Sequence, residues 1–290
     1  MKQNTINVIN RSISALFTTP TFKDVFRSGE SEYITEKMSS FKKQIGAPKG
    51  TTIGKAINKA YQYLTENYRN EYIYKNVIAN KLLLERHDLK EAGLLNEVRI
   101  GSSIADLIVI NGTNTIYEIK TELDSPIKLL KQIESYKKVS PKVFLVTHHS
   151  LIDKYSPIIA ESAVGLISLN ENQNLDIIYE PMADTSFFDI KMMMSMLRKD
   201  EYSGLIFSHF GYLPNVSNIN FYKECLKLAI QITETEFHSL MLVQLRKRIV
   251  KEARLLSSKK TPIELKHICF CQNPSKSEFE NLYRFLNLSI

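Results

Sequence analysis

Three charged side chains lie close together in one stretch of the chain, IADLIVINGTNTIYEIKTE. Asp106 lies in its first half, and Glu118 and Lys120 lie two residues apart in its second half. Two carboxylates a few ångströms apart repel each other, so they need a cation to compensate them. Oxygen ligands of this kind suit Mg²⁺ or Mn²⁺. A neighbouring lysine can orient or deprotonate a water and stabilise developing negative charge. The set would therefore suit attack on a phosphodiester.

The pattern of the same stretch predicts strands that bring these side chains together. Short, β-branched runs between turn residues predict strands at 97–100, 104–110 and 115–122. The step Asn111-Gly112 between the second and third runs is a strong hairpin signal. Side chains alternate faces along a strand, so Glu118 and Lys120 share a face, and the hairpin brings Asp106 beside them.

The elements around this hairpin alternate between helix and strand. Apolar residues at helical spacing predict one long helix over 53–86. Ser125-Pro126 predicts the start of another helix, which runs to Val139. Further strands are expected at 142–148, 164–170 and 175–181, and the chain is mostly helical from Phe187 onward. We therefore expect an α/β fold with three parts: a basic, helical N-terminal region (1–55), an α/β core (56–182) and a helical C-terminal region (183–290).

Asp106, followed after a gap by Glu118-Ile119-Lys120, resembles the signature of the PD-(D/E)XK nuclease superfamily. The order of predicted elements over residues 66–148 matches that superfamily, although Ala105 stands in place of its proline. The resemblance implies a mixed central sheet flanked by helices and a nuclease that needs Mg²⁺ (or Mn²⁺). It also implies that Asp106, Glu118 and the backbone carbonyl of Ile119 hold the metal while Lys120 positions the attacking water.

The helix predicted after the hairpin carries Gln132 and Tyr136, four residues apart and so on one face. This pair resembles the Q-x-x-x-Y element of RecB-like nucleases, which implies that both side chains orient Lys120 or the phosphate. The alternative is an exposed glutamine and a packed tyrosine.

An upstream helix often supplies a further acid in the superfamily. Glu71 is our choice for this metal ligand, and Glu66 and Glu97 are its rivals. The surrounding phrases NEYIYKNVIANKLLL and NEVRIGSSIADLIVIN also resemble the sce7726 group of bacterial proteins, which is treated as PD-(D/E)XK-like.

Two basic runs indicate surfaces for a polyanion, in a chain whose net charge is +7. Residues 41–65 hold five lysines and no acid, and Lys49 and Lys55 near a helix start suit phosphate contact. Residues 241–260 hold seven basic residues against one acid. We expect one helix there, with Lys247, Lys251 and Arg254 on one face and an apolar stripe on another: Leu242, Leu245, Ile249, Ala253 and Leu256. The alternative for each run is a solvated amphipathic face.

Several other classes of protein are disfavoured. No apolar run approaches the roughly 20 residues of a membrane span, the first residues lack a signal-peptide core, and three cysteines make no disulfide framework. A cytoplasmic protein is expected. The segment HICFC (267–271) lacks a second ligand pair at zinc spacing and favours a buried element, and His148-His149 favours exposed loop residues.

The first interpretation is therefore a metal-dependent nuclease in bacterial defence or mobile-element biology, with DNA favoured as substrate. One alternative is a nucleic-acid-binding module on the same fold without activity. Another is an interaction protein whose helical C-terminal half binds a partner or a second copy. DNA against RNA, and internal against terminal cleavage, are left open.

Overall fold

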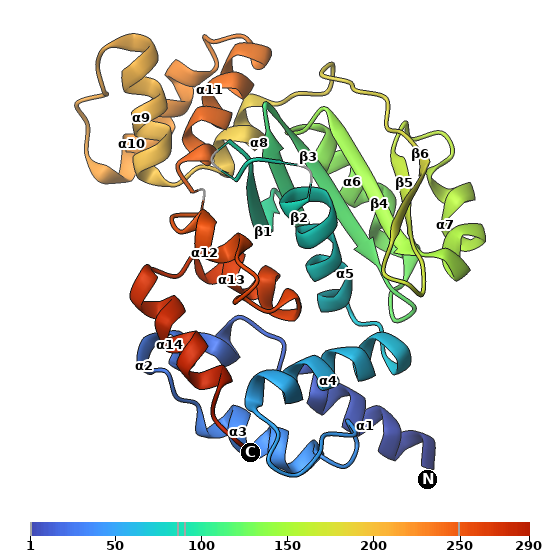
Figure 1. Cartoon of the computed structure of the whole chain (residues 1–290). Coiled ribbons are helices and arrows are strands. Elements are labelled where there is room, and N and C mark those ends of the chain that lie inside the picture. Colours follow the sequence, from blue (N-terminus) through green and yellow to red (C-terminus); the bar gives the residue numbers. More distant parts are fainter. Residues whose placement is uncertain (1, 86, 90, 249) are drawn as a thin grey trace.

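A mixed six-stranded sheet lies at the centre of the molecule, with helices on both of its faces (Figure 1). The computed structural model describes residues 2–85, 87–89, 91–248 and 250–290. The strands are β1 (Gly93–Ile100), β2 (Ser103–Asn111), β3 (Thr113–Lys120), β4 (Lys142–His148), β5 (Gly165–Leu169) and β6 (Leu175–Tyr179), and they lie side by side in this order. Strands β3, β4 and β5 are parallel, and the outer pairs are antiparallel. This confirms the expected α/β fold with its mixed sheet.

The predicted hairpin is present as β2 and β3. Asn111 pairs with Thr113 across Gly112, whose φ of +69° lies in the left-handed region that glycine adopts without strain. Leu107 pairs with Tyr117, so the next step along the hairpin sets Asp106 opposite Glu118. β3 ends at Lys120 and not at residue 122, because the chain turns there.

Helices between the parallel strands cover one face of the sheet. The 3₁₀ turn η3 (Pro126–Lys128) leads into α6 (Leu129–Lys137), which connects β3 to β4. Ser125 accepts a hydrogen bond from the Ile127 N–H at 3.4 Å, as expected of an N-cap. The turn η4 (His149–Leu151) and α7 (Ile152–Ile159) connect β4 to β5.

The prediction of one helix over 53–86 is wrong. The chain forms α4 (Ile53–Asn67), α5 (Glu71–Ile78) and a π-helical turn η2 (Ala79–Leu84), and Arg86 lies outside the described residues. Asn67 and Asn70 flank the break, and each donates a side-chain hydrogen bond, to the Tyr63 carbonyl and to the Ser14 hydroxyl. Asparagine favours such local alternatives to helix. The break places Glu71 at the first turn of α5, against the sheet.

The remaining helices come from both ends of the chain. They are α1 (Lys2–Ser14), η1 (Pro20–Phe22), α2 (Lys23–Ser28), α3 (Glu32–Phe41), α8 (Ile190–Ser195), α9 (Lys199–Phe210), α10 (Asn218–Ala229), α11 (Glu234–Arg246), α12 (Ala253–Ser257), η5 (Ile263–Leu265), α13 (Lys266–Gln272) and α14 (Lys276–Leu286). The helical C-terminal region α8–α14 is thus confirmed. The single helix expected over 241–260 is wrong, because α11 ends at Arg246 and α12 begins only at Ala253; Ile249 lies outside the described residues.

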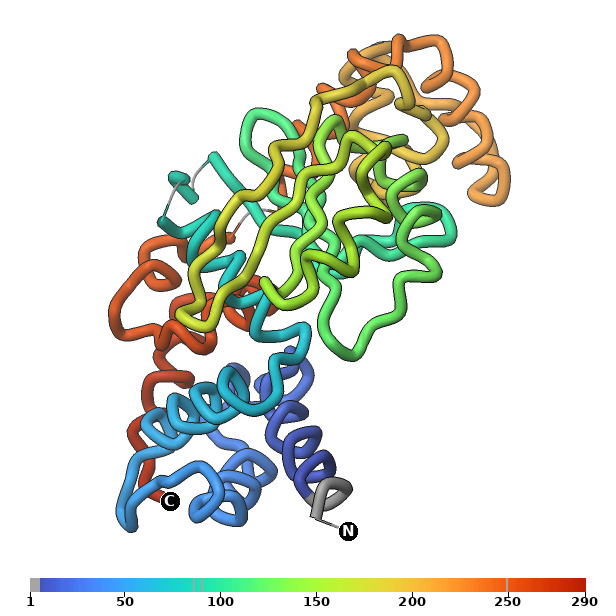
Figure 2. Tube along the Cα trace, turned by 90° about the vertical axis from the view of Figure 1, so that its right-hand side faces the viewer, coloured from blue at the N-terminus to red at the C-terminus, as the bar shows by residue number. Residues whose placement is uncertain are grey.

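Two hydrophobic cores use opposite faces of the sheet. One joins α1–α5 to α12–α14, and it reaches the sheet through Leu107, Tyr117 and Val146. The other joins α6–α11 to the opposite face through Ile108 and Ile116. The C-terminal region is therefore shared between two packing groups, and α14 lies beside α2 at the end of the molecule where both termini are found (Figures 1 and 2). The boundaries predicted near residues 55 and 182 stay a prediction.

Candidate active site

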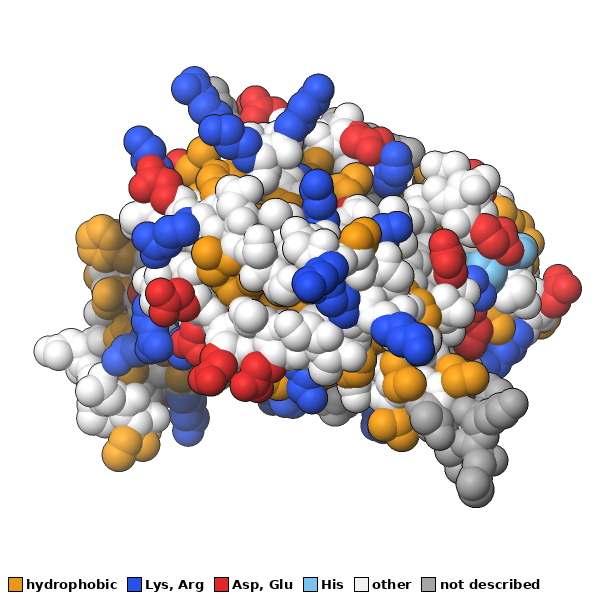
Figure 3. All heavy atoms as spheres, turned by 60° about the horizontal axis from the view of Figure 1, so that its bottom comes forward, with side chains coloured by type: hydrophobic (Ala, Val, Ile, Leu, Met, Phe, Trp, Pro, Cys, Tyr) orange, Lys and Arg blue, Asp and Glu red, His pale blue; other side chains and the backbone are white. Residues whose placement is uncertain are grey.

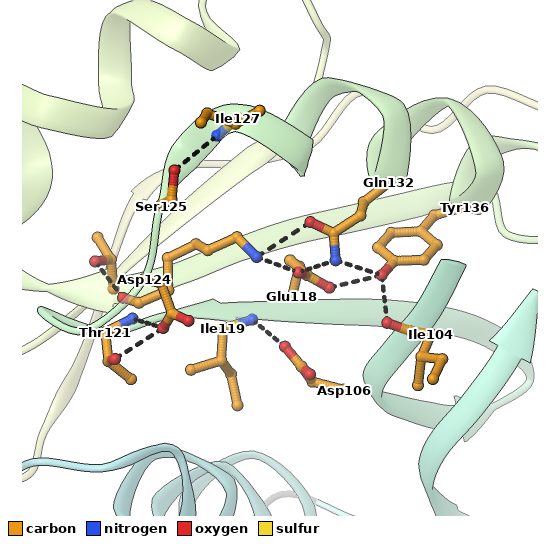
Figure 4. Close-up of polar contacts among 12 residues, drawn as sticks. Ile104, Asp106, Glu118, Ile119, Thr121, Asp124, Ser125, Ile127, Gln132 and Tyr136 are labelled. Carbon is orange, nitrogen blue, oxygen red and sulfur yellow. Dashed lines mark hydrogen bonds and ion pairs between the residues drawn. The ribbon is translucent and has the colours of Figure 1, made fainter. Parts of the chain in front are cut away.

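Glu118 is the centre of a buried polar cluster on the face of the sheet that α6 covers (Figure 4). Its Oε1 atom lies 2.6 Å from the Lys120 ammonium and accepts a hydrogen bond of 2.6 Å from the Gln132 amide. Its Oε2 atom lies 2.7 Å from the Tyr136 hydroxyl, and Gln132 also accepts from Lys120 at 3.1 Å. The hairpin and α6 thus bring four of the predicted residues together: Glu118, Lys120, Gln132 and Tyr136.

The Tyr136 hydroxyl lies between two oxygen acceptors. It carries one hydrogen and lies 2.7 Å from both Glu118 Oε2 and the Ile104 carbonyl oxygen. Burial raises the pKa of Glu118 against the opposing effect of Lys120. Tyr136 therefore links the Glu118 carboxylate to the backbone of β2.

Lys120 is held in its charged form. Burial by itself would lower the pKa of this amine, but the ion pair and hydrogen bond with Glu118, with help from Asp106 and Asp124, raise the pKa overall. Asp124 is fixed by hydrogen bonds from the Thr121 N–H (2.8 Å) and hydroxyl (2.7 Å). A protonated lysine stabilises negative charge and donates hydrogen bonds, but it does not accept a proton.

Asp106 lies beside this cluster, half-buried, at the edge between the two faces. Its Oδ2 atom accepts a hydrogen bond of 2.7 Å from the Ile119 N–H. Burial and the charges of Glu118 and Glu71 raise the pKa of Asp106 to about 8. Carboxylates that resist ionisation together form a donor set that a hard divalent cation would neutralise. Asp106, Glu118, Glu71 and the Ile119 carbonyl stay the predicted metal ligands; in the structure Glu118 is paired with Lys120 at 2.6 Å and Glu71 with Lys75 at 2.5 Å.

A lysine that sequence analysis missed completes the acidic group on the α5 side. Lys75 is 4% exposed, and its Nζ lies 2.5 Å from Glu71 and 3.0 Å from Glu97. The spacing of Glu71 and Lys75, four residues apart on a helix, was the signal that could have found it. Glu66, the other rival acid, lies exposed on α4.

Glu97 occupies a strained position opposite Asp106. Its neighbours Asn96 and Val98 pair with Leu107 and Ala105, and its φ of +52° is rare for a residue with a side chain. Glu97 nevertheless points to Lys75 and is 62% exposed. The structure thus brings two of the three candidate acids, Glu71 and Glu97, to the same lysine.

A large cleft of about 1330 Å³ opens beside Glu71, Lys75 and Glu97. Among the described residues it is lined by four acids and by seven basic side chains: Arg11, Lys23, Lys75, Arg198, Lys247, Arg248 and Lys251. Two predicted nucleic-acid-binding residues, Lys247 and Lys251, therefore lie on the same cleft as the acidic group. The two lysines do not share a helix, because both lie in the segment between α11 and α12.

The other predicted basic residues lie elsewhere. Lys49 and Lys55 line a separate hollow of about 520 Å³ at the start of α4. Arg254 lies exposed on α12, outside the residues that line the large cleft. On the face shown in Figure 3, Lys and Arg are dispersed among acidic and uncharged groups.

The fold and site define a mixed α/β protein with a buried acid–lysine cluster at one end of its sheet. A sequence profile of the bacteriophage P4 protein cII family matches residues 65–268, so the chain belongs to this family. No match was found among curated proteins or among solved structures. Within the described residues, no helix is both long and apolar enough to cross a membrane.

Proposed function

We propose that this protein is a metal-dependent nuclease that hydrolyses phosphodiester bonds, with DNA as the favoured substrate. The observation that carries the proposal is the cluster of Asp106, Glu118 and Lys120, supported from α6 by Gln132 and Tyr136. These are the residue types and the geometry that the PD-(D/E)XK resemblance implies.

Mg²⁺ or Mn²⁺ is the cofactor that fits the donor set. Asp106, Glu118, Glu71 and the Ile119 carbonyl would hold it, since their oxygens are hard ligands and the charges of Glu118 and Glu71 act together with burial to raise the pKa of Asp106. Glu118 and Glu71 would turn toward the ion from their ion pairs with Lys120 and Lys75. When bound, the metal would supply a Lewis acid and lower the pKa of a water.

Lys120 would act as an electrostatic and orienting group. Burial lowers the pKa of the Lys120 amine, but the charge of Glu118 raises it more, so the amine stays protonated at neutral pH. The ammonium would hold the attacking water and the developing charge on the phosphate. Gln132 and Tyr136 are positioning residues, because they fix Glu118 and Lys120 by hydrogen bonds.

The cleft would bind the nucleic-acid backbone. Lys247 and Lys251 are exposed on its wall, whereas Arg248 is neutralised by Glu201 at 2.5 Å. The exposed lysines suit phosphate contacts, which depend on charge and carry no sequence information. Lys49, Lys55 and Arg254 remain proposed contacts for a longer substrate.

The cellular setting proposed here is mobile-element biology, because the family takes its name from a bacteriophage protein. The outer helices offer a site for a protein partner or a second copy: Phe207 is 56% exposed and Ile219 is 92% exposed. The mass of the protein in solution, measured by light scattering, tests for self-association through these helices.

Incubation with closed-circular DNA, linear DNA and RNA, with Mg²⁺ or with EDTA, tests the proposed activity. We expect cleavage with Mg²⁺ and none with EDTA. Nicking of circular DNA would show internal cleavage. Asp106→Asn should abolish cleavage, because it removes a negative ligand while keeping the shape of the side chain.

Control proteins separate loss of the site from loss of the fold. Asp176→Asn, on β6, is the matched control and should cut as the wild type does. Binding without cleavage of any substrate would favour the non-enzymatic nucleic-acid-binding module. Equal cleavage by Asp106→Asn would show that the assigned site is wrong.

A further inference from the structure

Two adjacent histidines and a glutamate converge at the carboxyl end of β4. His148 is the last residue of the strand, His149 begins η4, and Glu171 lies in the turn between β5 and β6. One ligand atom from each residue lies within 4.8 Å of the others. The Nε2 atom of His149 is 3.3 Å from a Glu171 carboxylate oxygen. Two segments separated in the chain therefore present three coordinating groups to one point.

His148 carries a buried ring nitrogen that has no hydrogen-bond partner. The side chain is 2% exposed, and its Nε2 atom is unpaired in the structure. Its Nδ1 atom lies 2.9 Å from the Ser150 hydroxyl and accepts a long hydrogen bond of 3.4 Å from the Ser150 N–H. Metal binding at Nε2 would require the other tautomer, in which Nδ1 donates to the Ser150 hydroxyl and gives up the contact with the N–H. A buried polar atom without a partner costs free energy unless a ligand satisfies it.

We propose that His148, His149 and Glu171 bind a first-row transition-metal ion, with Zn²⁺ as the best fit. Two imidazoles and one carboxylate are a ligand set found for Zn²⁺ with a fourth, open position. Imidazole ligands disfavour Mg²⁺, which prefers oxygen. A hydrogen bond from the second ring nitrogen is a regular feature of histidines that ligate metals, and in the metal-bound form Nδ1 of His148 would donate to the Ser150 hydroxyl, 2.9 Å away.

To bring the three ligand atoms to the spacing of a metal site, only small movements of the exposed side chains are needed. Ligand atoms around a tetrahedral Zn²⁺ with bonds of about 2.1 Å lie roughly 3.4 Å apart. The buried His148 is the fixed member, whereas His149 and Glu171 are 43% and 66% exposed and can rotate. The turn that carries Glu171 is itself ordered, because Asn170 accepts hydrogen bonds of 3.0 Å from the N–H groups of Asn172 and Asn174.

Neighbouring charges leave the site free for a metal. Glu122 approaches His148 at 3.9 Å but is paired with Arg69 at 2.9 Å. β4 pairs with β3, and Thr147 lies opposite Lys120. This second site is therefore close to the proposed nuclease centre but uses none of its ligands.

Zn²⁺ titration by calorimetry, with the full chain and without Mg²⁺, tests the proposal. We expect one ion per chain, with the affinity at least tenfold weaker in His149→Ala and in Glu171→Gln. Both residues are exposed, so neither substitution threatens the core. The matched control is His209→Ala: His209 faces a single glutamate, Glu236, at 3.4 Å and has no second histidine beside it.

Asp106→Asn separates this site from the proposed nuclease centre. Zn²⁺ affinity that persists in Asp106→Asn but falls in His149→Ala supports the proposal. Affinity lost in Asp106→Asn and unchanged in His149→Ala and Glu171→Gln would place the ion at the acidic centre and overturn it. Absence of binding by the wild type would overturn it as well. None of these outcomes depends on whether the protein cleaves nucleic acid.

Discussion

At the scale of single residues, Glu118 joins three side chains of different chemical type into one hydrogen-bonded cluster. Lys120, Gln132 and Tyr136 all contact the same carboxylate within 2.7 Å. The site is buried, so each contact is stronger than it would be in water, and each missing contact costs more. Substitutions in this unit should therefore have effects that do not add.

Lys120→Ala distinguishes an enzyme from a binding module. We expect the cleavage rate to fall by roughly 10²-fold or more, because a contact to the developing charge is lost. Affinity for DNA should change little, since one buried ammonium is not a cleft contact. Lys120→Arg should not restore the rate, because the planar guanidinium is wider than the ammonium that it replaces in the buried cluster. Single-turnover cleavage and equilibrium binding on one substrate check this; an equal loss of both would make Lys120 a binding residue.

At the scale of elements, loops decide which charges face the cleft. The break between α4 and α5 places Glu71 on the cleft beside Lys75, and the segment after α11 carries Lys247 and Lys251 to the cleft wall. Lys49 and Lys55 line a different hollow, at the start of α4. The predicted basic residues of the two runs therefore lie on separate surfaces.

Reversal of charge on the cleft wall should weaken binding of a short oligonucleotide. Lys247→Glu with Lys251→Glu removes two phosphate contacts, so the log–log salt slope should fall by about two. Lys49→Glu with Lys55→Glu changes the net charge equally on the other surface and should lower the slope less. Binding measured across a salt series checks both pairs. Equal slopes for the cleft pair and the wild type would mean that those lysines do not contact the backbone.

Two buried histidines should make the fold sensitive to acid. Burial lowers the pKa of His238 to about 4 and that of His267 to about 3. In the unfolded chain the histidine pKa is about 6.5, so the unfolded state takes up protons before the folded state as the pH falls. The free energy of unfolding should therefore decrease at pH values below about 6.5. Each histidine contributes about 1.4 kcal/mol per pH unit until its folded pKa is reached.

Urea denaturation between pH 7 and pH 4.5 measures this slope. His238→Gln keeps a donor for the Asn114 side-chain oxygen, which lies 2.8 Å from His238, but removes the titrating group. The variant should flatten the acid slope, and His209→Gln, at the surface, should not. An unchanged slope in His238→Gln would contradict the assignment of the acid sensitivity to this residue.

At the scale of the whole molecule, the sheet joins two cores into one cooperative unit. The core of α1–α5 with α12–α14 and the core of α6–α11 both include residues of β2, β3 and β4. The first core also joins N-terminal and C-terminal helices, since it contains residues of α1 and α2 together with residues of α14, which lies beside α2. A substitution that removes packing in one core should therefore lower the free energy of unfolding of the whole molecule.

Phe279→Ala in α14 tests this coupling. Phe279 is 0% exposed, so the cavity should cost about 3–5 kcal/mol of the free energy of unfolding. We expect one urea transition, followed by far-ultraviolet circular dichroism, at a lower midpoint. The control Phe207→Ala, at a residue that is 56% exposed, should change the midpoint little. A split into two transitions would show that the two cores unfold independently.

The sequence alone determined the elements that depend on neighbouring residues. Alternation along β3 placed Glu118 and Lys120 on one face, Asn111-Gly112 set the hairpin, and helical spacing put Gln132 and Tyr136 together. These relations follow from backbone geometry over a few residues, so they survive without knowledge of the rest of the fold.

Tertiary structure decided what depends on contacts between distant segments. Local pattern continued the helix through residues 68–70, whereas the chain breaks there and Asn70 bonds Ser14. It did not reveal that Lys75 would be buried between Glu71 and Glu97, or that the C-terminal helices would divide between two cores. Burial and charge compensation belong to the packed molecule, because they arise only when separate elements exclude water from a shared site.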